Sequence, residues 1–193
     1  MIEPQLQSLG KLDQAFFKLE NKILVNQKGL GKRVILVNFL QNLKFTHRVS
    51  GQFLVITTKE KLSHWKYLLD TWTDLQSLVY DDSDKNGGME NLRLWCLYHL
   101  DVTIKGRITN RNQLYRFDVL ITTVDHINNQ ADTFIRKVPF MQVIVDQAEL
   151  KSHRAATTKI ACKRIICSTS NPMPKNIVEI IDLVDCVDPF TVD

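Results

Sequence analysis

Residues 26–33 carry the residue types from which proteins build phosphate-binding turns. They read Asn-Gln-Lys-Gly-Leu-Gly-Lys-Arg and stand between a short apolar run and a stretch with helical periodicity. In that context the backbone N–H groups of the turn and the N-terminus of the following helix attract phosphate oxygens. The segment therefore has the context that a phosphate-binding turn needs, although Gly-Leu-Gly-Lys alone is a weak signal.

The elements that must position this turn follow from the pattern of apolar residues. Helical periodicity predicts helices over residues 6–18, 32–43, 62–71 and 176–186. Continuous apolar runs predict buried strands over residues 22–25, 53–56, 78–80, 118–121, 142–145 and 164–167. Strands that alternate with helices indicate a parallel sheet with right-handed crossovers and helices on both faces, hence an α/β fold. We expect one domain over residues 1–193, because no repeat or linker interrupts the pattern.

Composition and charge fit an α/β domain and leave the partner open. The 193 residues are 44% hydrophobic and 24% charged, as in an ordinary soluble domain. The net charge of +4 permits contact with nucleic acid without requiring it. No apolar run approaches the roughly 20 residues that span a bilayer, and the N-terminus lacks the pattern of a signal peptide. We therefore expect an intracellular protein with no membrane partner.

The cysteines form no metal motif. They occur at positions 96, 162, 167 and 186, without a close pair. A zinc site built from His153, Cys162 and Cys167 has a spacing that matches no zinc motif. Free thiols in apolar runs pack as small hydrophobic groups, so we expect reduced cysteines and no bound metal.

Five segments, in the same order, resemble the motifs of the Swi/Snf family of chromatin-remodelling ATPases within the superfamily 2 helicases. Residues 26–33 resemble the family's Asp-Glu-Met-Gly-Leu-Gly-Lys-Thr box, and residues 53–65 resemble the segment that ends in Asn-Trp. Residues 117–125 resemble its Phe-Asp-Val-Leu-Ile-Thr-Thr-Tyr-Glu segment. Residues 143–149 take the place of the Asp-Glu-Ala-His box, and residues 168–189 follow the segment around Gly-Thr-Pro. The chain thus resembles a degenerate N-terminal lobe of such an ATPase, which implies a RecA-like three-layer α/β/α sandwich with a mainly parallel sheet.

Two substitutions remove the chemistry that the resemblance implies. The P-loop threonine of the family, whose hydroxyl ligates Mg²⁺, is Arg33 here, and arginine has only hydrogen-bond donors. The family's catalytic glutamate is Gln147, whose amide cannot accept the proton of the attacking water. Asp146, on the metal side of the family's site, is retained in the segment 146–149. We therefore expect a pseudo-ATPase with no catalytic residue.

Several nucleotide-binding positions of the family are retained. Gln5 matches the residue that reads the edge of the adenine. Gly29, Gly31 and Lys32 match the P-loop and could still hold a phosphate, with Arg33 partly replacing the metal. We favour the alternative, in which the glycines serve the tight turn and Lys32 faces solvent, so we expect no cofactor. We also expect the second lobe, which supplies the family's arginine finger, to be absent.

The family's DNA track is only partly retained. Thr122 and Thr123 match family residues that contact the DNA backbone, and hydroxyl groups suit phosphate contacts. Alternatively, both are β-forming residues that end a strand and cap a turn. The serine–threonine pair before the family's tryptophan is Glu60 and Lys61 here, and a carboxylate repels phosphate. DNA or a nucleosome is therefore the less favoured partner.

We expect a protein-binding scaffold in a nuclear, chromatin-associated complex. The surface that would face a second lobe and the divergent insert at about residues 81–116 are the candidate docking regions. Trp65 and Trp72 are expected to pack against the sheet, whereas the role of Trp95 is open. Two alternatives remain, a nucleic-acid-binding module and half of an ATPase that another chain completes.

Overall fold

The computed structural model describes the central sheet, the helices that cover it and short pieces of the insert. The described residues are 2–25, 31–81, 96–97, 103–104, 107–108, 114–128, 135–136, 138–148, 157, 159–160, 162, 164–169, 181 and 184. The helix predicted over residues 176–186 lies outside them, apart from Ile181 and Val184, and so does Gly29.

Six strands form one sheet in which every neighbouring pair is parallel, in the order β1-β10-β9-β2-β8-β3. They are β1 (Lys22–Val25), β2 (Gln52–Thr57), β3 (Ser77–Val79), β8 (Val119–Thr123), β9 (Phe140–Asp146) and β10 (Ile165–Thr169). Each strand lies within two residues of its predicted bounds. The predicted α/β class with a mainly parallel sheet is confirmed.

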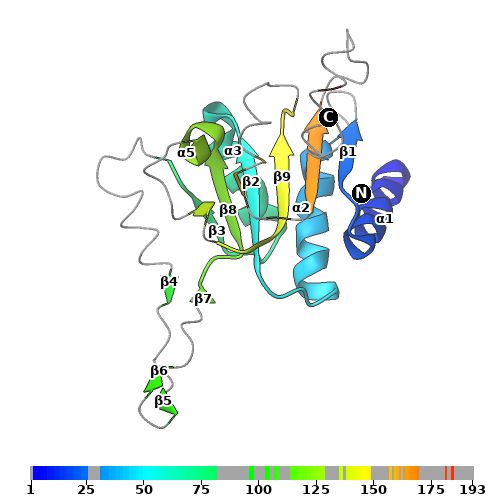
Figure 1. The fold of residues 1–193 in the computed structure, drawn as a ribbon. Helices are drawn as coiled ribbons and strands as arrows, with labels where there is room; N and C mark the ends of the chain where they lie inside the picture. Colours follow the sequence, from blue (N-terminus) through cyan, green and yellow to red (C-terminus); the bar gives the residue numbers. More distant parts are fainter. Residues whose placement is uncertain are drawn as a thin grey trace.

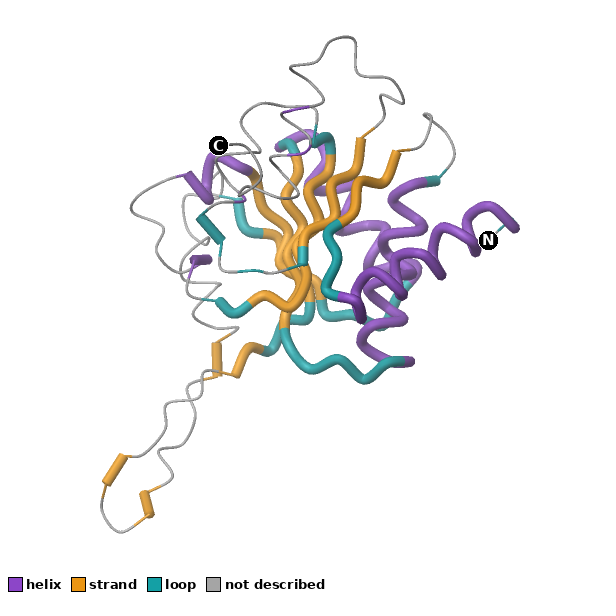
Figure 2. Tube along the Cα trace, turned by 45° about the vertical axis from the view of Figure 1, so that its right-hand side comes forward, coloured by secondary structure: helices purple, strands orange, loops and turns teal. Residues whose placement is uncertain are grey.

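Helices on both faces of the sheet give three layers. The helices α1 (Glu3–Lys18), α2 (Lys32–Gln41) and α3 (Leu62–Trp72) lie on one face, and α5 (Val124–Asn128) lies on the other (Figure 1, Figure 2). Successive side chains of a strand point to opposite faces, so Val55 packs in one core and Leu54 in the other. Because both faces are covered, the strands are apolar throughout, which is why continuous runs predict them.

Two helices differ from their predicted bounds by more than one residue. α1 begins at Glu3, because proline suits the first turn of a helix and Gln5 Oε1 accepts a hydrogen bond from the backbone N–H of Ile2. α2 ends at Gln41 and continues directly into the π-helical turn η1 (Asn42–Thr46). None of the helices in the described part of the chain is long and apolar enough to cross a bilayer.

Short antiparallel pairs occur within the predicted insert. These are β4 (Cys96–Leu97) with β7 (Leu114–Tyr115), and β5 (Thr103–Ile104) with β6 (Arg107–Ile108). These four described strands are separate from the six-stranded sheet.

The two tryptophans of α3 have different environments. Trp65 is fully buried, as predicted, whereas 55% of Trp72 is exposed. The prediction that Trp72 packs against the sheet is wrong. Its helix ends at this residue, and the extended backbone of Thr73 leads the chain away.

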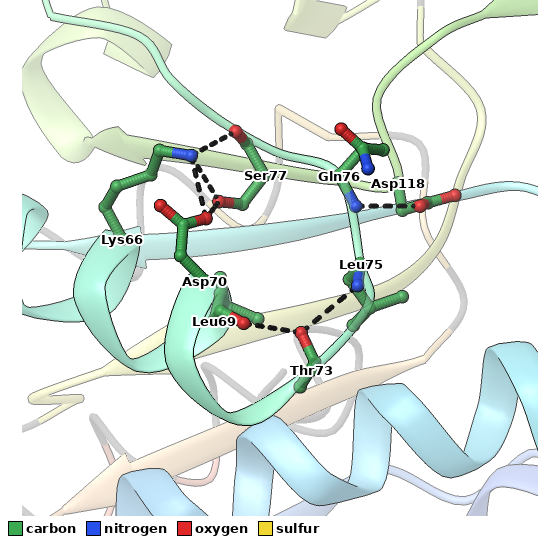
Figure 3. Close-up of polar contacts among 8 residues, drawn as sticks. All are labelled: Lys66, Leu69, Asp70, Thr73, Leu75, Gln76, Ser77 and Asp118. Atoms are coloured by element: carbon green, nitrogen blue, oxygen red, sulfur yellow. Dashed lines mark hydrogen bonds and ion pairs between the residues drawn. The ribbon is translucent and has the colours of Figure 1, made fainter.

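Polar side chains of α3 cover the β3 edge of the sheet (Figure 3). Lys66 Nζ donates to the carbonyl oxygen and to the hydroxyl of Ser77, both at 2.9 Å, and it contacts Asp70 at 2.8 Å. The Ser77 hydroxyl donates to Asp70 Oδ1 at 2.7 Å. An edge strand presents unpaired backbone groups, so a lysine on its carbonyl oxygen protects it from pairing with another strand.

Candidate functional site

The carboxyl ends of β2, β9 and β10 meet at one end of the sheet, because all three strands are parallel. The register pairs Ser168 with Asp146 and Val145 with Ile56, so Thr57 and Asp146 end their strands at the same level. α2 starts at this end, with Gly31 as its N-cap. The fold therefore brings Lys32 against the end of β10 and Arg33 against the end of β9.

Three residues direct hydrogen-bond donors at one oxygen of Asp146. Arg33 Nε lies 2.9 Å from Asp146 Oδ2, and Arg33 Nη2 lies 2.8 Å from it. Trp65 Nε1 donates to the same oxygen at 2.9 Å, and Thr57 Oγ1 donates at 3.3 Å. The Asp146 side chain is only 4% exposed, so its negative charge needs a partner. The guanidinium of Arg33 supplies it.

These residues do not fit the Mg²⁺ ion that the family's site implies. Magnesium needs oxygen ligands, and its protein ligand on α2 would be a hydroxyl at position 33. Arg33 offers only donors, and its positive charge already lies on Asp146 Oδ2. A cation at this place would meet the guanidinium charge instead of a second oxygen ligand. The side chain of Arg33 thus occupies the electrostatic position of the metal.

Gln147 follows Asp146 in a left-handed backbone conformation, with φ 58°. Thr58 Oγ1 donates to Gln147 Oε1 at 3.2 Å. The side-chain carbonyl is therefore engaged by a hydroxyl, and a neutral amide has no basic group with which to take a proton from water.

Two contacts hold the described start of α2, at Gly31 and Lys32. Lys32 Nζ donates to the carbonyl oxygen of Thr169 at 2.9 Å, which corrects the expectation that Lys32 faces solvent. Gly31 has φ +69°, and a Cβ atom there would lie 2.8 Å from Gln5 Nε2. Glycine is required at position 31 on both grounds, which favours the turn-forming interpretation of this residue. Gln5 is thus adjacent to the turn.

The two threonines that match DNA-contacting positions are buried. Thr122 is fully buried, and its hydroxyl donates to the carbonyl oxygen of Tyr80 at 3.1 Å. Thr123, the last residue of β8, is 6% exposed. These environments suit the structural alternative, and a DNA contact by either residue stays a prediction.

The zinc site considered from the sequence would include Cys162. The described residues contain no group of three histidine, cysteine or acidic side chains that could hold a metal ion. Cys162 Sγ donates to the carbonyl oxygen of Arg164 at 3.2 Å, and burial raises the pKa of its thiol. Cys167 is fully buried in the core. His153, the third residue of the zinc set considered from the sequence, lies outside the described residues.

Trp65 and Thr57 belong to the site but are not among the site residues predicted from the sequence. A signal for Thr57 exists, because residues at the carboxyl end of a buried strand gather at the same end of a parallel sheet. A buried indole also needs an acceptor for its N–H group, and Asp146 is the buried acceptor at that end.

Comparison with known proteins identifies the family. A model of the SNF2-related domain matches residues 11–192. Chromodomain-helicase-DNA-binding protein 8 of Homo sapiens is 26% identical over 193 residues, which cover 97% of this chain and 7% of that protein. Chromodomain-helicase-DNA-binding protein 7 of Homo sapiens is 26% identical over 192 residues, or 97% of this chain and 6% of that protein. The chain therefore spans less than a tenth of the length of these relatives.

A solved structure shows the same fold. The Sulfolobus solfataricus SWI2/SNF2 ATPase core in complex with dsDNA superposes with a TM-score of 0.71 at 14% sequence identity. The superposition covers 97% of this chain and 36% of that chain. The RecA-like α/β fold is thus confirmed. Together with the match over residues 11–192, it shows that the chain belongs to the SNF2-related domain family, as an N-terminal lobe of a Swi/Snf-type helicase-like ATPase.

Proposed function

We propose that this chain is an ATPase-like domain that does not hydrolyse ATP and serves as a protein-binding scaffold. The observation that carries the proposal is the contact between Arg33 and Asp146. It stands where phosphoryl transfer in such sites depends on a metal held by a hydroxyl and a carboxylate. Gln147 adds a second reason, because its amide cannot take up the proton of an attacking water.

The scaffold in this proposal works in a chromatin-associated complex of the nucleus. The relatives are named chromodomain-helicase-DNA-binding proteins, and the solved structure holds dsDNA. DNA or a nucleosome is therefore the second candidate partner. The burial of Thr122 and Thr123 argues against a DNA contact at these two positions, so a protein partner is preferred.

Steady-state ATP hydrolysis tests the inactivity. The chain is assayed with Mg²⁺, with and without duplex DNA or nucleosomes, beside Lys32→Ala as the matched control. We expect the same background rate for both, because neither protein has the metal-side hydroxyl or the catalytic carboxylate. Turnover that requires Mg²⁺ and that Lys32→Ala abolishes would establish an ATPase, working alone or completed by a second chain.

Affinity capture from nuclear extract, followed by size-exclusion chromatography, tests the scaffold role. We expect a stoichiometric protein partner that Lys32→Ala also retains, since binding does not need a nucleotide. A clean monomer that captures nothing would contradict this role. A gel shift on duplex DNA that weakens steeply with salt would favour the DNA-binding alternative instead.

A further inference from the structure

A groove of about 430 Å³ runs between α1 and the outermost strand, β1. Figure 1 shows β1 at the end of the sheet with α1 beside it. The lining residues come from one side of α1, from the turn and from the whole of β1. On α1 they include Lys11, Leu12, Ala15 and Lys18, and the turn contributes Glu20. The groove thus follows the strand over its full length.

The groove faces the backbone edge of β1. Successive side chains of a strand point to opposite faces, so a groove lined by all of Lys22–Val25 reaches the strand from its edge. Among the described strands β1 pairs only with β10, on the other side. The opposite end of the sheet differs, because Lys66 covers the carbonyl oxygen of Ser77 there (Figure 3). The β1 edge is therefore the one end of the described sheet that a further strand could extend.

The charges of the groove favour an acidic ligand. Glu20 is paired with Lys22 at 2.7 Å, and a hydrogen bond and the charge of Lys22, with a smaller effect of Lys18, lower the pKa of Glu20. The positive charges of Lys11 and Lys18 are then left uncompensated within the lining. Leu12 and Ala15 are buried and make an apolar floor. The groove therefore combines backbone groups, an apolar base and a net positive charge.

We infer that this groove binds an extended acidic segment of a partner protein, which adds as a strand to β1. Strand addition supplies affinity through backbone hydrogen bonds, and alternate side chains supply specificity. Acidic side chains of the ligand lie toward Lys11 and Lys18 on α1, and the side chains that alternate with them point to the opposite face of the sheet. A second copy of this chain would bring the same lysines against each other, so like charges oppose self-pairing. One part of the inference rests on the proposed scaffold role, namely that the partner is a protein.

Fluorescence anisotropy tests the inference with a labelled ten-residue peptide of alternating glutamate and valine, and with its lysine counterpart. The variant is Lys11→Glu/Lys18→Glu. Its control is Lys59→Glu/Lys61→Glu, which makes the same change of net charge on the turn η2 (Lys59–Lys61), outside the groove. We expect the wild type and the control to bind the acidic peptide alike. The groove variant should bind about tenfold more weakly, and the lysine peptide should not bind.

The position of the bound peptide is checked by amide chemical shifts, which we expect to change along β1 and the facing side of α1. Three results would overturn the inference. These are no saturable binding at low salt, equal weakening in both double variants, and shifts confined to other elements. If the wild type self-associates and the groove variant does not, the ligand of the groove is a second copy of this chain and not an acidic segment of another protein. None of these results depends on ATP hydrolysis, so the inference and the proposed inactivity can fail separately.

Discussion

Both Nε and Nη2 of Arg33 lie within 2.9 Å of the same oxygen of Asp146. This contact joins the first turn of α2 to the last residue of β9, across 113 positions of sequence. The resemblance to the family implies a metal ion at this place, held between a hydroxyl group and the carboxylate. Here one side chain neutralises the buried carboxylate and links the two elements.

Removal of the arginine should therefore destabilise the fold. Arg33→Met leaves the buried carboxylate of Asp146 without a counter-charge, and we expect a loss of about 2–3 kcal/mol. The loss is below that of a fully buried pair, because the Arg33 side chain is 25% exposed. Urea denaturation measures it. The double variant Arg33→Met/Asp146→Asn should lose less than the sum of the single variants, and strict additivity would show that the two residues are not coupled.

The indole N–H of Trp65 makes a separate contribution at the same oxygen. Trp65→Phe keeps a large ring in the core but removes the donor to Asp146, and we expect a loss of about 1.5–3 kcal/mol. Trp72→Phe, at the exposed end of the same helix, is the matched control and should stay within about 0.5 kcal/mol of the wild type. Equal effects of the two substitutions in thermal or urea denaturation would contradict the role of Trp65.

The fold follows from the sequence more completely than the site does. The six strands could be predicted because a parallel sheet covered on both faces requires continuous apolar runs, such as the one that forms β2. The start of α1 could not, because it depends on a contact between Gln5 and the backbone of Ile2 that apolar periodicity does not record. The position of Trp72 on a helix predicts that it packs against the sheet, but the end of that helix decides its exposure.

Part of the site could be predicted from the sequence, and part of it could not. The resemblance brings together Arg33, Asp146 and Gln147, because all three occupy motif positions, but it does not say what their side chains contact. That Arg33 turns onto Asp146, and that Lys32 turns onto the end of β10, depends on distances between α2 and the sheet. The participation of Trp65 requires the packing of α3 as well. Such contacts are properties of the assembled layers rather than of any local pattern.

Two glycines offer a paired test of backbone conformation. At Gly31, φ is +69° and a Cβ atom would crowd Gln5, so Gly31→Ala should destabilise the protein by about 1–2 kcal/mol. Gly10 lies within α1 with no atom within 4 Å of the added methyl group, so Gly10→Ala should stabilise it by about 0.5–1 kcal/mol. Thermal denaturation of both variants gives the sign of each effect. A neutral Gly31→Ala would contradict the left-handed turn.

The cluster at the β3 edge predicts a dependence of stability on pH. Burial acts to raise the pKa of Asp70, but hydrogen bonds from Lys66 and Ser77 and the charge of Lys66 outweigh it and lower the pKa below its ordinary 3.8. A carboxyl group with a lowered folded-state pKa stabilises the fold above pH 3.8. That stabilisation is lost as the pH falls through the folded-state pKa.

The free energy of unfolding of the wild type, relative to Asp70→Asn, should therefore shrink as the pH falls from about 5 to about 3. The change is small because the Asp70 side chain is 47% exposed and solvent screens its charge. Ser77→Ala removes one of the hydrogen bonds and should show a weaker dependence. A difference that grows toward low pH would contradict the sign.

Titration calorimetry of ATP, in the presence of Mg²⁺ and again in excess EDTA, tests most directly whether Arg33 fills the place of the metal. The contact of Arg33 with Asp146 leaves no oxygen pair for the ion. We therefore predict that Mg²⁺ makes no difference to the binding of ATP by the protein, once the heats of matching titrations without protein are subtracted. Saturable ATP binding that appears with Mg²⁺ and disappears in EDTA would contradict the account.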